Sequence, residues 1–233
     1  MKKIFVFLAC IALLTVACNK KGTADNKSAD NKKDFASSPA ASPKASNDGS
    51  MFPGFDAAAE VKALQGTWKV KDNAFGKELS TWKIEGKKLT IIRGDKTKQG
   101  QLEIKYPGEL AFVEKSNGGQ SRSYFAFAHS GDDVYIGLGT GGIKRGDAYM
   151  LADDGVVVFK SGSCKYYKKK MFGGFDKPAD VKCELKDEAG KKILSYQVPD
   201  SFNKGEFKKS SVEVVGDVLV NEQLKSSKAQ KTQ

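Results

Sequence analysis

Two patterns of apolar residues divide the chain. Residues 4–16 form an almost unbroken apolar run, whereas from residue 67 onward apolar and polar residues mostly alternate in short segments. In Thr67–Lys71 and Thr81–Glu85, for example, every second side chain is apolar. Because successive side chains of a strand point to opposite faces, this alternation predicts half-buried β-strands.

Turn-forming residues separate these segments. Glu85-Gly86-Lys87, Asn117-Gly118-Gly119 and Asp154-Gly155 supply the positive φ angles that tight hairpins need. Many short strands joined by such turns predict a mainly β chain, with an antiparallel meander barrel of about eight to ten strands and a small C-terminal β extension. One short helix is expected at 57–65, capped by Asp56. The expected strands are 67–71, 81–85, 88–93, 101–106, 109–114, 123–129, 133–138, 147–151, 156–160, 165–168, 181–186, 192–198, 206–209, 212–215 and 218–221.

The N-terminal apolar run has the marks of a secretory signal. Lys2 and Lys3 precede it, and Ala17-Cys18 ends it. The run is well short of the roughly 20 residues that a membrane-spanning helix needs. Residues 1–17 are therefore predicted to be a signal peptide.

Leu14-Thr15-Val16-Ala17-Cys18 resembles the lipobox of bacterial lipoproteins, although Thr15 stands where that pattern usually has Leu, Val or Ile. The resemblance implies that cleavage precedes Cys18 and that its thiol carries lipid, including palmitate. The implied location is the cell envelope, anchored to a membrane. Asn19 in place of an inner-membrane Asp favours the outer membrane, on its periplasmic or surface face. The alternative is an ordinary signal peptide that ends near a cysteine.

Composition divides the rest of the chain. Residues 18–50 are rich in small, polar and charged residues and are predicted to be a disordered, lipidated spacer. Residues 51–170 are assigned to the barrel and 171–233 to the extension, with a disordered tail from about residue 224.

An internal repeat links the two predicted folded regions. Met51–Lys62 and Met171–Lys182 are identical at eight of twelve positions. Each copy begins with a Met-Phe-x-Gly-Phe-Asp segment. These apolar side chains are expected to pack over one end of the barrel in both copies. The alternative is that they form a contact site.

Two cysteines remain once the predicted signal is removed and Cys18 is acylated. In an oxidising compartment, Cys164 and Cys183 most simply form a disulfide. The formal net charge of the whole chain is +11, and its lysines are spread along the sequence. That charge could favour an anionic glycan or an envelope protein, or serve solubility alone. Nucleic acid is not expected as a partner.

Gly66-Thr67-Trp68, preceded by a short helix and followed by a meander, is similar to the Gly-x-Trp element of lipocalins. The resemblance covers about residues 57–168 and implies that Trp68 packs across the closed end of a barrel. Later lipocalin sequence marks do not occur in this chain, and Trp68 could equally be an ordinary core residue.

A small apolar or amphipathic ligand inside the barrel is the first functional hypothesis. Phe125, Phe127, Tyr135 and Tyr149 are its candidate contacts. Along 123–129, Phe125, Phe127 and His129 share one face, and the opposite face carries small alanines that leave room. The alternative is a structural or surface-interaction lipoprotein without a small ligand.

Catalysis is not expected. Gly137–Gly142 matches a dinucleotide-binding glycine pattern but is not followed by the helix that such a site needs, so a loop or bulge is predicted. His129 is the single histidine, and Asp132-Asp133 and Asp153-Asp154 fit turns. No catalytic residue, metal ligand or cofactor is predicted.

Overall fold

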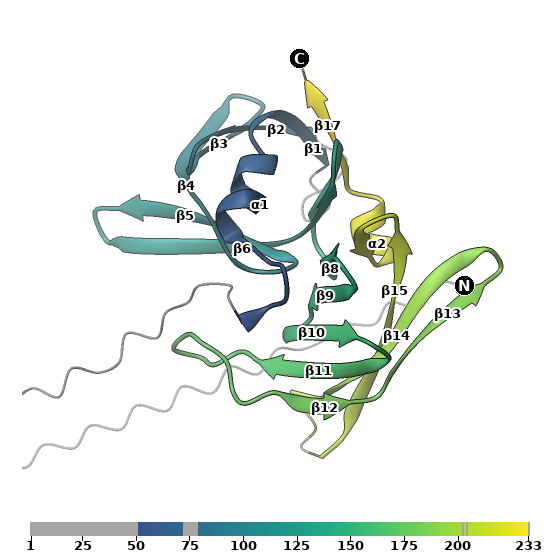
Figure 1. The fold of residues 1–233 in the computed structure, drawn as a ribbon. Helices are drawn as coiled ribbons and strands as arrows, with labels where there is room; N and C mark the ends of the chain where they lie inside the picture. The colour runs from purple at the N-terminus through teal and green to yellow at the C-terminus, as the bar shows by residue number, and fades with distance from the viewer. Residues whose placement is uncertain (1–50, 72–78, 202, 204, 233) are drawn as a thin grey trace, which may run out of the picture. The chain divides into compact units, whose positions relative to one another are not determined.

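The computed structural model describes residues 51–71, 79–201, 203 and 205–232. Two β units make up this part of the chain, a closed barrel and a nine-stranded sheet, and both are antiparallel (Figure 1). The predicted mainly β, barrel-containing fold is confirmed. Cys18, the predicted signal and the predicted spacer lie outside the described residues.

Eight strands close the barrel in the order β1-β17-β7-β6-β5-β4-β3-β2. Alternation places Trp82 and Ile84 of β2 in the core, and Lys83 between them faces outward. Consecutive strands pair as hairpins, as the turn signals predict. The strands are β1 (Gly66–Lys71), β2 (Leu79–Glu85), β3 (Lys88–Arg93), β4 (Lys96–Tyr106), β5 (Glu109–Ser116), β6 (Gly119–Ser130), β7 (Asp133–Gly137) and β17 (Lys228–Thr232).

The C-terminal residues complete the barrel, so the prediction of a disordered tail from about 224 is wrong. Helix α2 (Glu222–Lys225) is followed directly by β17, which pairs with β1 on one side and β7 on the other. Ala229 is buried in the barrel core, and Lys231 Nζ lies 5.3 Å from the centre of the Trp68 ring. Hydrogen bonding to two neighbouring strands orders a segment whose own side chains are mostly polar.

The second unit combines strands from both predicted regions, so the boundary at residue 170 does not match the structure. The order is β12-β11-β10-β9-β8-β16-β15-β14-β13. Its strands are β8 (Gly141–Arg145), β9 (Ala148–Ala152), β10 (Gly155–Lys160), β11 (Ser163–Lys168), β12 (Ala179–Val181), β13 (Cys183–Glu188), β14 (Lys191–Pro199), β15 (Phe207–Val215) and β16 (Val218–Val220). Pairing of β8 with β16 joins the two regions.

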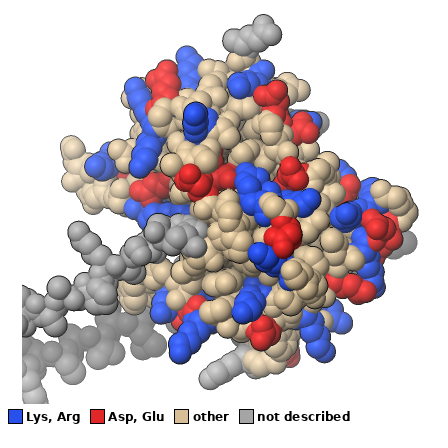
Figure 2. Space-filling model, in the orientation of Figure 1, with Lys and Arg blue, Asp and Glu red and all other residues tan. Residues whose placement is uncertain are grey.

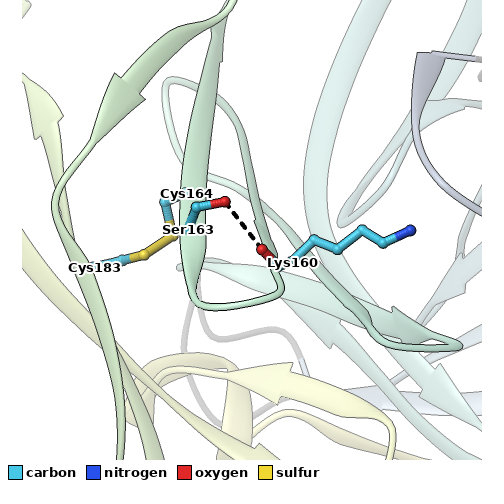
Figure 3. The surroundings of a disulfide bond; sticks show 4 residues. All are labelled: Lys160, Ser163, Cys164 and Cys183. Atoms are coloured by element: carbon cyan, nitrogen blue, oxygen red, sulfur yellow. Dashed lines mark hydrogen bonds between the residues drawn. A yellow bond between two sulfur atoms is a disulfide. The ribbon is translucent and has the colours of Figure 1, made fainter.

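This sheet curls until its end strands meet. Only Lys182 separates β12 from β13, and its carbonyl oxygen accepts a hydrogen bond from Gln197 N of β14 at 2.9 Å. The predicted Cys164–Cys183 disulfide is present and joins β11 to β13, with the two Cα atoms 6.0 Å apart. Figure 3 shows it beside the β10–β11 turn, where Ser163 Oγ donates to the Lys160 carbonyl oxygen at 3.0 Å.

Helix α1 (Ala57–Ala63) lies over one end of the barrel (Figure 1). Asp56 caps it as predicted, because its side chain accepts a hydrogen bond from Ala58 N at 2.8 Å. Just after the helix, the Leu64 carbonyl oxygen accepts a hydrogen bond from Trp68 Nε1 at 2.8 Å. Trp68 is fully buried in the core beneath the helix.

Candidate functional site

The four predicted ligand contacts do not come together. Phe127 is completely buried in the barrel core, and Tyr149 lies in the separate core of the second sheet. Tyr135 packs in a third cluster with residues of β16 and α2. Phe125 contacts the Trp82 ring edge-on, with centroids 5.1 Å apart, and it alone among the four lines a surface hollow.

The small-residue face of β6 is largely covered. Phe125, Phe127 and His129 share a face, as predicted, and Phe127 belongs to the barrel core. Ala126 and Ala128 lie on the opposite face, where they pack with a cluster from β16 and α2. The expectation that these alanines leave room is wrong for Ala128, which is completely buried against Val218, Val220 and Leu224. The half-buried Ala126 also borders a surface groove outside the barrel.

Both β interiors are filled by side chains. The barrel core includes Trp68, Trp82, Leu102 and Phe127, each no more than 3% exposed. A hollow of about 50 Å³ remains near Trp82 at one end, whereas small-molecule sites usually measure roughly 300–1,000 Å³. Within the described residues, the barrel holds space for water and not for an amphipathic ligand.

A buried ion cluster joins α1 to both units. The Glu60 carboxylate is 3% exposed and accepts hydrogen bonds from Arg145 Nη2 of β8 at 2.7 Å and 3.0 Å. It also contacts Nε2 of His129, from β6. His129 therefore has a structural position, as its isolation in the sequence suggests. Since three elements contribute one side chain each, the cluster fixes the helix against both sheets.

Glycines mark the place where the two units touch. A Cβ on Gly108 would lie 2.0 Å from the Gly141 carbonyl oxygen, and one on Gly141 would lie 2.5 Å from the Phe127 carbonyl oxygen. Gly137–Gly142 thus covers the end of β7, the connection 138–140 and the start of β8, with no helix directly after it. The glycine pattern serves close backbone packing, which the sequence alone did not indicate.

A surface groove runs along this junction. It encloses about 610 Å³ between the barrel and the second sheet. Aromatic and apolar side chains line it together with charged residues of both signs. Its lining includes Tyr106, Glu109, Tyr124, Phe125, Leu138, Thr140, Asp153, Asp154, Lys169 and Met171. Figure 2 likewise shows basic and acidic residues intermixed over one face of the molecule.

A lysine between two tyrosines forms one end of the groove. Lys169 Nζ lies 4.8 Å from the ring centres of both Tyr106 and Tyr124 and 2.8 Å from a Glu109 carboxylate oxygen. Tyr106 donates its hydroxyl hydrogen to the same carboxylate. Burial, followed by the hydrogen bond and charge of Glu109, raises the pKa of Tyr106 well above its usual range. The contacts among Lys169, Glu109 and Tyr106 therefore fix the side chains at this end of the groove.

Asp153 forms part of the other wall. Its carboxylate accepts a hydrogen bond from the Tyr196 hydroxyl at 2.6 Å and lies 3.6 Å from Lys208 Nζ. Burial and the Asp153 charge raise the pKa of Tyr196. Asp153 and Asp154 are in the β9–β10 turn, as predicted, and Asp154 has a φ of 53°.

Neither a metal cluster nor a spanning helix is found in the described part of the chain. No group of three or more His, Cys, Asp or Glu side chains there could hold a metal ion. No helix within the same residues is long and apolar enough to cross a membrane. The sequence matches no known family model, no curated protein and no solved structure.

Proposed function

We propose that this chain is a lipid-anchored, non-enzymatic protein of a bacterial cell envelope that binds a protein partner in the groove between its two β units. The observation that carries the proposal is the contrast between filled β interiors and an open groove of about 610 Å³. The anchor is the lipid predicted on Cys18, with the outer membrane as the favoured site.

The composition of the groove favours a protein partner. Tyr124, Phe125 and Leu138 supply aromatic and apolar contact area, and Tyr124 and Leu138 are 51% and 37% exposed. Charged side chains stand around them, including Asp154 and Lys169. Aromatic contacts surrounded by a polar rim are the usual anatomy of a protein–protein interface.

A filled barrel argues against the first functional hypothesis. A ligand inside it would have to displace buried residues such as Leu102 or Phe127, and loss of such core packing typically costs about 2–5 kcal/mol per side chain. A partner in the groove needs no such rearrangement, because the groove is already formed.

Site-specific photocrosslinking in living cells tests the groove. A photoreactive residue replaces Leu138 in the groove or, as a matched control, Leu79, which is 54% exposed on β2. We expect a discrete protein adduct from position 138 that is weak or absent from position 79. Adding Thr140→Trp, which places a bulky side chain in the groove, should abolish the adduct. Equal labelling from both positions, or no adduct from position 138, would contradict the proposal.

A further inference from the structure

The first phenylalanine of the Met-Phe-x-Gly-Phe-Asp repeat is buried in one copy and exposed in the other. Phe52 is 2% exposed, and its ring centre lies 5.4 Å from that of Phe175. The equivalent Phe172 is 99% exposed, and its neighbour Met171 is 92% exposed. The expectation that both copies pack over the barrel holds for Phe52 and Phe55, which are buried, and for Phe175, which packs against the barrel core. It is wrong for Met171 and Phe172, and Met51 is 45% exposed.

One residue in the repeat accounts for the difference. Gly173 has a φ of 96°, whereas the corresponding residue of the first copy is Pro53, whose ring restricts φ to about −65°. Gly173 N donates to the Lys170 carbonyl oxygen at 3.1 Å, and Lys170 N donates to the Gly174 carbonyl oxygen at 3.0 Å. Met171 and Phe172 therefore occupy the apex of a hydrogen-bonded turn.

This apex, defined as Met171 and Phe172 and called the apolar tip, has further apolar neighbours. Met51 and Tyr124 are 45% and 51% exposed and line a hollow of about 140 Å³ together with Met171. Exposing two large apolar side chains forgoes the stabilisation that their burial would give. An exposed apolar patch of this kind marks a contact site.

Basic residues outnumber acidic ones in the segment that carries the apolar tip. From β11 to β12 its acidic residues are Asp176, which lies 3.7 Å from Lys170 Nζ, and Asp180, which stands opposite Lys165 in the β11–β12 pairing. Its basic residues are Lys165, Lys168, Lys169, Lys170 and Lys177. Lysine side chains are attracted to an anionic membrane surface. An apolar apex within a lysine-rich segment complements a bilayer that has anionic headgroups.

Met51 is the member of this surface that lies nearest in sequence to the predicted anchor. Met51 is the first described residue, and residues 19–50 connect it to Cys18. A lipid on Cys18 would therefore hold the apolar tip near the bilayer at high effective concentration. We infer that the apolar tip inserts into the headgroup region of an anionic bilayer, with the exposed Lys168 and Lys177 on lipid phosphates. This inference shares with the proposed function only the lipid anchor predicted on Cys18.

Depth-dependent fluorescence quenching tests the insertion. The full lipidated protein carrying Phe172→Trp is reconstituted into vesicles of phosphatidylglycerol or phosphatidylcholine that contain brominated acyl chains. The matched control is Phe207→Trp, because Phe207 is 58% exposed on β15 and also precedes two lysines. Trp68 and Trp82 are buried and provide a constant background.

We expect the brominated acyl chains to quench most of the fluorescence of the tryptophan introduced by Phe172→Trp in phosphatidylglycerol vesicles. In phosphatidylcholine vesicles they should quench little of it. The Phe207→Trp emission should persist in both. Unquenched Phe172→Trp emission, equal quenching of the two variants, or equal quenching in the two lipids would overturn the inference. The crosslink from position 138 has an independent readout, so either proposal can fail alone.

Discussion

At the scale of single residues, one buried carboxylate organises the contact between helix and sheets. Glu60 is 2% exposed and neutralises Arg145 while contacting His129. Removing one member of a buried ion pair usually costs about 3–5 kcal/mol, because the remaining charge is left desolvated without its partner. Arg145 retains some exposure, which places the expected cost toward the lower end.

Glu60→Gln is therefore expected to lower the free energy of unfolding by about 3 kcal/mol, measured by urea denaturation. Glu114→Gln is the matched control, because Glu114 pairs at 3.2 Å with a Lys98 side chain that is 65% exposed. Such a surface pair contributes about 1 kcal/mol or less. Similar small losses in both variants would show that the buried cluster does not hold α1 in place.

At the scale of elements, the last strand of the chain closes the barrel between β1 and β7. Alternation predicted most strands correctly, but β17 has only one buried apolar residue, Ala229. Thr232 of β17 pairs with Thr67 of β1, which is 165 residues away in sequence. Short-range patterns of apolar and polar residues carry no information about such a pairing. The repeat was visible in the sequence, whereas the groove was not, because strands far apart in the chain build it.

Hydrogen exchange should show this closure directly. Amides of β17 bonded within the barrel are expected to exchange about as slowly as those of β1, since opening either strand breaks the same β1–β17 pairing. Ala229→Asp, which places a charge in the core, should release the amides of β17. Fast exchange of β17 in the unmodified protein would indicate that the barrel is open at this position.

The disulfide links β11 to β13 in the second sheet, much as β17 links β1 to β7 in the barrel. Cys164 and Cys183 are 19 residues apart, and closing a loop of this size stabilises a fold by about 3 kcal/mol. Replacing both cysteines by serine should lower the free energy of unfolding by about that amount. A reductant should have the same effect on the unmodified protein and none on the double variant. Insensitivity of both proteins to reductant would mean that the bond makes no net contribution.

At the scale of the whole molecule, buried tyrosines tie stability to alkaline pH. Burial and the charges of Asp154 and Asp153 raise the pKa of Tyr166 to about 12, and the pKa values of Tyr106 and Tyr196 are also raised. An unfolded tyrosine ionises near pH 10. Because the folded state favours the neutral phenols, their contribution is complete below about pH 10 and is lost as the pH rises through about 12.

Ultraviolet titration of phenolate absorbance should therefore proceed in two stages. The second stage is expected to come from Tyr106, Tyr166 and Tyr196, which should ionise only at strongly alkaline pH or on unfolding, because burial and nearby carboxylates raise the pKa of each. Tyr196→Phe should remove part of the second stage and make stability less dependent on pH in this range. Ionisation of all seven tyrosines near pH 10 in a protein that stays folded would contradict the packing described above.

At this scale, the barrel interior is filled and the proposed binding groove lies outside it. Native mass spectrometry of the lipidated protein, extracted from its own membrane, tests this most directly. The predicted result is the mass of the polypeptide with its covalent lipid and no retained small molecule. A stoichiometric small molecule that is released only when the protein unfolds would contradict it, because such a ligand would have to occupy the space now assigned to Trp68, Leu102 and Phe127.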